Sequence, residues 1–177
     1  ASLTLAFFSM AANAQDEVAA LRRATSGVDI FKLLRLDGNF VRWPADAAGN
    51  VTLTYKVLDE FQAFDGARNC RRMTGVAALE TRSNIDAARF HAELDAAFAM
   101  WEQAANLRFR EAQPGEAANI TIGTQVDPEG WAFADVFYDA RSDGQFKPIS
   151  QALVCLNPEK LWKVGFDGDL KTYDLRY

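Results

Sequence analysis

The stretch from Ala97 to Ala112, AFAMWEQAANLRFREA, constrains the fold most, because the spacing of its apolar residues changes within it. Up to Asn106, apolar residues recur every three or four positions, which predicts an amphipathic helix with one buried face. This stripe consists of Phe90, Leu94, Ala97, Phe98, Trp101 and Ala105. After Asn106, Leu107 and Phe109 alternate with arginines, which is strand spacing. We therefore expect a long helix, with Trp101 and its stripe in the core, to run directly into a strand.

Similar patterns elsewhere predict an α+β fold. A hairpin is expected around the Asp37-Gly38 turn, and the alternating run 51–58 is the strongest strand pattern. Ser83 or Asn84, with Asp86 behind it, is expected to cap the long helix. The predicted elements are strands 31–36, 40–43 and 51–58, the helix 85–105, and strands 107–111, 119–124, 131–136 and 149–156. They predict a twisted mixed sheet of about five main strands with one long helix packed on it.

The beginning of the chain resembles a secretory signal peptide without its basic start. An apolar run is followed by Ala12-Asn13-Ala14, a typical cleavage site, and the run is too short to span a bilayer. We therefore expect residues 1–14 to be a signal-peptide remnant and residues 15–177 to form one domain. The expected location is secreted, either extracellular or periplasmic, without a membrane anchor. A net charge of −5 argues against a nucleic-acid partner.

The chain has two cysteines, Cys70 and Cys155, and one histidine. In an exported protein an even number of cysteines favours a disulfide, and two cysteines allow one pairing. A reactive thiol and a metal ligand are the less favoured alternatives. The absence of a CxxC motif leaves too few partners for a cysteine-based zinc site.

The order of these elements resembles the catalytic domain of the matrixin-like metzincins, a family of zinc metalloendopeptidases. The similarity runs from about Trp43 to Tyr177. It rests on Arg42-Trp43-Pro44 before strand 51–58, the Trp101–Phe109 segment, Ala118-Asn119-Ile120-Thr121-Ile122, the segment 126–134, and the strand and turn 149–162. The resemblance implies a metzincin N-terminal subdomain.

The family's next element is a helix with the motif HExxHxxGxxH, whose histidines bind zinc and whose glutamate activates a zinc-bound water. Residues 172–177 are similar to the start of such a helix, with Thr172 as its N-cap, but this chain contains no HExxH. The resemblance therefore implies peptide-bond hydrolysis by the full-length protein, with zinc ligands beyond Tyr177. The resemblance places no catalytic residue within residues 1–177, and this part of the protein is expected to be inactive by itself.

The resemblance also implies a substrate-binding edge strand at Gly130, Trp131, Ala132, Phe133 and Ala134, which would pair with an extended peptide or protein substrate. Trp131 and Phe133 would be the aromatic residues nearest the cleft; packing in the core is the alternative. Asp139 and Asp143 are candidates for binding calcium, and a solvated acidic loop is the favoured alternative. His91 falls beside the helical stripe and is expected at the surface.

Two other functions remain open. One is a complete secreted binding module, without catalysis, that captures an extended peptide on an exposed edge strand. The other is a glycan-active protein, for which the carboxylates show no spacing typical of a catalytic pair.

Overall fold

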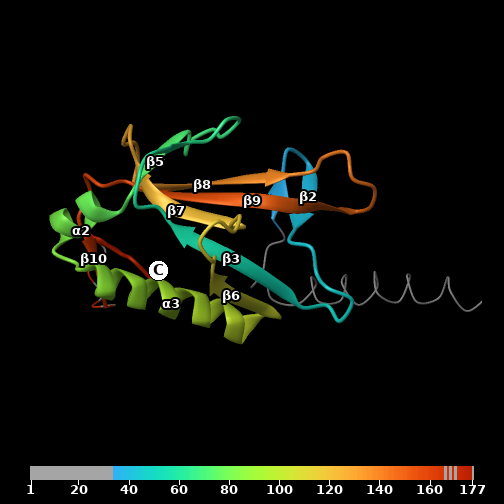
Figure 1. Cartoon of the computed structure of the whole chain (residues 1–177), viewed down its shortest axis with the longest axis horizontal. Coiled ribbons are helices and arrows are strands. Elements are labelled where there is room, and N and C mark those ends of the chain that lie inside the picture. The colour runs from blue at the N-terminus through green and yellow to red at the C-terminus, as the bar shows by residue number, and fades with distance from the viewer. Residues whose placement is uncertain (1–33, 166, 168, 170, 177) are drawn as a thin grey trace, which may run out of the picture. The chain divides into compact units, whose positions relative to one another are not determined.

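The chain folds around one mixed β-sheet with a long helix along one face (Figure 1). The computed structural model describes residues 34–165, 167, 169 and 171–176. The expected signal-peptide remnant 1–14 and the first residues of the predicted hairpin, 31–33, lie outside the described residues. No helix in the described part of the chain is long and apolar enough to cross a membrane.

The α+β class with a mixed sheet is confirmed, and within the described residues the sheet has nine strands. These are β1 (Arg35–Leu36), β2 (Asn39–Arg42), β3 (Val51–Val57), β4 (Gln62–Ala63), β5 (Arg72–Thr74), β6 (Leu107–Glu111), β7 (Ile120–Gln125), β8 (Ala132–Tyr138) and β9 (Phe146–Leu156). Two short strands, β10 (Trp162–Lys163) and β11 (Tyr173–Asp174), form a separate parallel pair. The helices in the described part of the chain are α2 (Ala77–Ser83) and α3 (Ala87–Ala104).

The centre of the sheet is parallel, in the order β6-β3-β7-β9, and β8 lies antiparallel beside β9. Parallel neighbours need a crossover connection, which α3 provides between β3 and β6. The predicted Asp37-Gly38 hairpin is confirmed: both residues have positive φ (47° and 85°), as a type I′ turn requires. Strand β9 begins at Phe146, three residues earlier than predicted, because Phe40 of β2 pairs with Phe146.

The helix cap differs from the prediction. Asp86 is the N-cap of α3, and its carboxylate accepts the Arg89 N–H at 2.7 Å. Ser83 belongs to α2, a helix that the sequence pattern did not indicate, and Asn84 ends that helix in a left-handed conformation (φ 52°). The cap prediction at 83–84 was wrong because those two residues terminate the preceding helix.

The prediction that the whole stripe of α3 is buried was also wrong. Phe90 is buried and Leu94 and Phe98 are partly buried, but Trp101 is 58% exposed and Ala105 is exposed. In the second half of α3 the residues that meet the sheet are Asp95, Phe98 and Glu102, which line a small hollow against β3 and β6. Trp101 is not among the residues that line this hollow.

The first part of the long connection 59–83, up to the end of β5, covers the other face of the sheet. Its strand β5 pairs antiparallel with the end of β7, where β3 no longer reaches. Gly123 permits this approach, because a Cβ there would lie 2.7 Å from the Thr74 carbonyl oxygen. The core therefore has two clusters. The helix-side cluster is Tyr55, Val76, Leu79, Ile85, Phe90, Ile122, Leu156 and Trp162. The disulfide-side cluster is Leu58, Phe64, Ala67, Cys70, Met73, Leu153 and Cys155.

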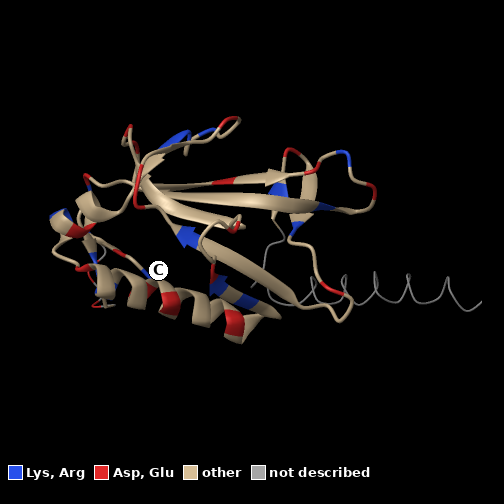
Figure 2. Ribbon diagram, viewed as in Figure 1, with Lys and Arg blue, Asp and Glu red and all other residues tan. Residues whose placement is uncertain are grey.

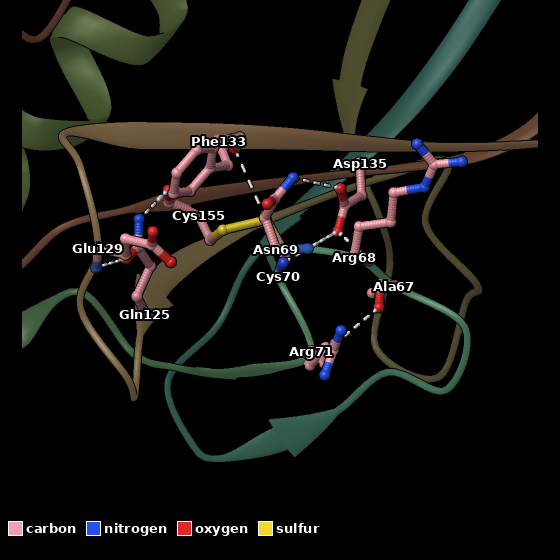
Figure 3. The surroundings of a disulfide bond; sticks show 10 residues. All are labelled: Ala67, Arg68, Asn69, Cys70, Arg71, Gln125, Glu129, Phe133, Asp135 and Cys155. Atoms are coloured by element: carbon pink, nitrogen blue, oxygen red, sulfur yellow. Dashed lines mark hydrogen bonds between the residues drawn. A yellow bond between two sulfur atoms is a disulfide. The ribbon is translucent and has the colours of Figure 1, made fainter. Parts of the chain in front are cut away.

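The predicted disulfide between Cys70 and Cys155 is present, with its sulfurs 2.05 Å apart and both residues fully buried. It ties the 59–83 connection to the central strand β9 (Figure 3). Because the cysteines are 85 residues apart, the bond restricts a large loop in the unfolded chain.

Replacing both cysteines by alanine is expected to lower the free energy of unfolding by about 2–5 kcal/mol, since the unfolded chain regains the entropy of that loop. Denaturant titration of the double variant under oxidising conditions measures this, and the reduced unaltered protein is the control. An unchanged unfolding free energy would contradict the account.

Candidate functional site

Strand β8 presents a free edge, because among the described strands it pairs with β9 alone. The Asn157 N–H donates to the Trp131 carbonyl (2.8 Å), which marks that pair as hydrogen-bonded. Bonded and non-bonded pairs alternate along an antiparallel ladder. Ala132, Ala134 and Val136 therefore direct their N–H and C=O groups away from β9, toward the side where another strand could add.

At the opposite edge of the sheet, the outward N–H groups of Leu107 and Phe109 in β6 are bonded within the chain. The outward N–H of Phe109 donates to Glu102 Oε1 at 2.7 Å, and the N–H of Leu107 donates to the Ala105 carbonyl at 2.7 Å. Satisfied edge groups cannot recruit another strand. Between β6 and β8, β8 is therefore the strand whose outward backbone groups are available for peptide pairing.

The two aromatic residues of the predicted edge segment are partly buried and pack against the two core clusters. The Trp131 ring lies 4.3 Å from that of Tyr173 and 5.9 Å from that of Trp162. Phe133 packs against the disulfide-side cluster. Ala132 and Ala134 are exposed on the helix side of the sheet, so backbone groups and small side chains form the accessible surface. Gly130 turns into this strand with φ 60°, and a Cβ there would approach the Phe133 ring at 3.2 Å.

A buried carboxylate supports β8 from its disulfide side. Asp135 Oδ2 accepts the N–H groups of Arg68, Asn69 and Cys70 at 2.8–2.9 Å, and its Oδ1 accepts the Asn69 side-chain amide (Figure 3). Burial alone would raise the pKa of Asp135, but these N–H donors outweigh it and hold the pKa below its usual value. The ionised carboxylate thus holds the 68–70 loop against the strand.

A hollow of about 400 Å³ lies against the second half of β8, between that strand, the β1–β2 turn and the loop 66–69. An exposed ion pair crosses its rim, with Arg68 Nη2 at 3.3 Å from Asp37 Oδ1. Tyr138 donates its hydroxyl to Asp37 Oδ2 at 3.2 Å. A peptide that lengthens the sheet at β8 would pass this hollow.

The calcium candidates Asp139 and Asp143 both lie in the loop between β8 and β9. Asp139 Oδ1 accepts the Arg141 N–H at 2.9 Å, a local turn, and Asp143 is an exposed loop residue. In the described part of the chain, no three His, Cys, Asp or Glu side chains gather in a way that could hold a metal ion. His91 is partly buried on α3, and its ring meets that of Phe90 edge-on at 6.0 Å.

Two polar contacts of α3 had no signal in the sequence. Tyr55 donates its hydroxyl to Asp95 at 3.1 Å; burial first, and then this hydrogen bond, raise the pKa of Tyr55 to about 12. Glu93, whose side chain is 2% exposed, pairs with Arg89 and with Arg176. The Tyr55–Asp95 and Glu93–Arg176 contacts join residues far apart in the chain, so helical spacing alone does not reveal them, whereas Glu93 and Arg89 are four residues apart on α3. Figure 2 shows the acidic positions spread along α3.

Comparison of the chain with protein-family models, with curated proteins and with solved structures found no match.

Replacing Tyr55 by Phe is expected to remove a late step from the alkaline titration of tyrosine absorbance. An unfolded tyrosine ionises near pH 10 and folded Tyr55 at about 12. The stability that this group contributes is therefore complete below pH 10 and is lost as the pH rises from 10 through 12. Asp95→Asn, which keeps an acceptor but removes the charge, is expected to lower the pKa of Tyr55. A step near pH 12 that persists in Tyr55→Phe would refute the assignment.

Proposed function

We propose that residues 15–177 form the N-terminal part of the catalytic domain of a secreted matrixin-like zinc metalloendopeptidase. The full-length protein would hydrolyse peptide bonds with a zinc-bound water and a glutamate base, both carried by a helix after Tyr177. The described residues supply the scaffold and the peptide-binding edge. They hold no set of zinc ligands, so no chemical step is assigned to them.

The observation that carries this proposal is the arrangement around β8. The strand expected to bind substrate is an outer strand, antiparallel to its one neighbour β9, with unpaired backbone groups at Ala132, Ala134 and Val136. An extended peptide gains affinity at such an edge from main-chain hydrogen bonds. The order strand, long helix, strand, strand, edge strand, strand also agrees with the resemblance.

Exposed apolar residues on the helix side of the sheet support the proposal that another segment packs there. On the helix side, Ala132 and Ala134 of β8 are exposed, and Val154 of β9 and Ile120 of β7 are only partly buried. Trp101 of α3, 58% exposed, lies in the apolar stripe of its helix. Exposed apolar surface of this kind is typical of an interface. The zinc-binding helix of the resembled family would cover it.

Residues 173–176 suggest where that helix begins. Asp174 Oδ1 accepts the Arg176 N–H at 2.9 Å, two residues on, as a helix N-cap does. Its Oδ2 is buried and has no hydrogen-bond partner among the described residues, so the N–H groups of a first helical turn would satisfy it. Thr172, the N-cap expected from the sequence, instead donates its hydroxyl to Asp169.

The alternative is a secreted binding module that captures an extended peptide on β8 without hydrolysing it. The free edge of β8 favours this function equally, since strand addition needs no metal. The two proposals differ in the sequence that they require after Tyr177.

We expect the full-length protein to contain HExxH after Tyr177, to bind about one zinc ion per chain and to cleave a denatured protein substrate until a chelator is added. Metal analysis and a peptide-cleavage assay measure this. Replacement of the motif's glutamate by glutamine is the control, because it removes the base and keeps the ligands. Peptide binding without zinc or cleavage would establish the binding module instead.

Replacing Ala134 by proline tests the edge in either function. Proline removes the outward N–H and spares the ladder to β9, as edge strands tolerate. We expect KM for an extended peptide, or the dissociation constant of a binding module, to rise by about threefold to tenfold, the effect of one lost hydrogen bond. Ala134→Ser keeps the N–H and is the matched control. An unchanged KM in a proline variant of normal stability would overturn the role of the edge.

A further inference from the structure

The buried carboxylate of Glu93 on α3 holds the segment 173–176 in place. Glu93 Oε2 accepts from Arg176 Nε at 2.8 Å and lies 2.6 Å from Arg176 Nη2. Its other oxygen, Oε1, lies 3.0 Å from Arg89 Nε, one turn back on the same helix. The Glu93 side chain is 2% exposed, whereas those of Arg89 and Arg176 are 52% and 30% exposed. Charge-assisted pairs at such distances are strong and directional.

The same segment is bound on its other sides as well. The Leu175 N–H donates to the Lys163 carbonyl at 2.9 Å, and Leu175 packs against the helix-side core cluster. The Tyr173 ring lies 4.3 Å from that of Trp131, directly before β8. One short segment therefore joins α3, through Glu93, to the beginning of the edge strand.

Asn157 holds the residues directly before β8 in place. Its side-chain amide donates to the Gly130 carbonyl at 2.8 Å, its N–H donates to the Trp131 carbonyl, and its carbonyl accepts from Trp162 Nε1 at 3.0 Å. Asn157 is 2% exposed. Asn157 thus contacts both the residues before β8 and Trp162, which pairs with Tyr173.

We propose that Arg176, held by Glu93, is a positioning residue that sets the direction of the helix after residue 176 relative to the peptide on β8. This inference rests on the proposed function, because it is the zinc helix that would be aligned. A buried carboxylate needs its charge compensated, and Arg89 alone can do that from within α3. The second arginine, from a distant segment, serves the alignment.

Two variants separate alignment from charge compensation. Arg176→Gln leaves Glu93 paired with Arg89, and Arg89→Gln leaves it paired with Arg176, so each removes one ion pair from the same carboxylate. Arg176→Lys keeps the charge but not the two-nitrogen contact and should restore activity in part.

In the full-length protein, Arg176→Gln is expected to lower kcat by about tenfold to a hundredfold, the usual effect of losing a residue that orients ligands, with KM within about twofold. Arg89→Gln should leave both constants within about twofold. Equal losses of kcat in the two variants, or none in either, would overturn the proposal.

Amide hydrogen exchange tests the positioning role of Arg176 without an activity measurement. In Arg176→Gln the amide of Leu175 should exchange about tenfold faster or more, whereas Arg89→Gln should leave it unchanged. If the unaltered full-length protein showed no zinc-dependent hydrolysis, the proposed function would fail. The exchange rates would still decide whether Arg176 fixes the segment, and equal rates in both variants would refute it.

Discussion

The central parallel strands carry apolar residues on both faces of the sheet. Each face must therefore be covered by another part of the chain. Helices α2 and α3 cover one face, and residues 59–74 of the long connection cover the other. The connection on the disulfide side contains little regular secondary structure beyond β4 and β5, so specific bonds hold it on the sheet. The Cys70–Cys155 bond ties it to β9, and the Asp135 carboxylate ties its 68–70 loop to β8.

These anchors leave the outer edge of β8 open while they hold its inner side. Asp135 points into the disulfide side and satisfies three backbone N–H groups there. The neighbouring residues Ala132 and Ala134 point to the helix side and stay exposed. The strand is therefore anchored on one side and its outer edge is available, as strand addition needs. In β6, by contrast, the outward N–H groups of Phe109 and Leu107 bond to Glu102 and Ala105. Open backbone groups are therefore a feature of the β8 edge and not of the β6 edge.

The segment 173–176 connects that edge to the helix layer. Its aromatic, backbone and ionic contacts reach Trp131 directly before β8, Lys163 of β10 and Glu93 of α3. In the proposed peptidase the catalytic group and the bound peptide must be aligned closely, since small displacements reduce the rate strongly. A segment fixed by several independent contacts meets this need better than a free loop.

The sequence alone determined the features that depend on near neighbours. Alternation predicted β3 and β6, the Asp37-Gly38 pair predicted its turn, and the even cysteine count predicted the disulfide. Helical periodicity predicted α3, although its cap is Asp86 and its Trp101 is exposed. Tertiary structure decided the features that depend on distant partners: β5 on the end of β7, Asp135 beneath the 68–70 loop, and Glu93 with Arg176. Such contacts join residues 50 to more than 80 positions apart. Spacing within a helix or strand reports which face a residue occupies, but only packing decides what that face meets.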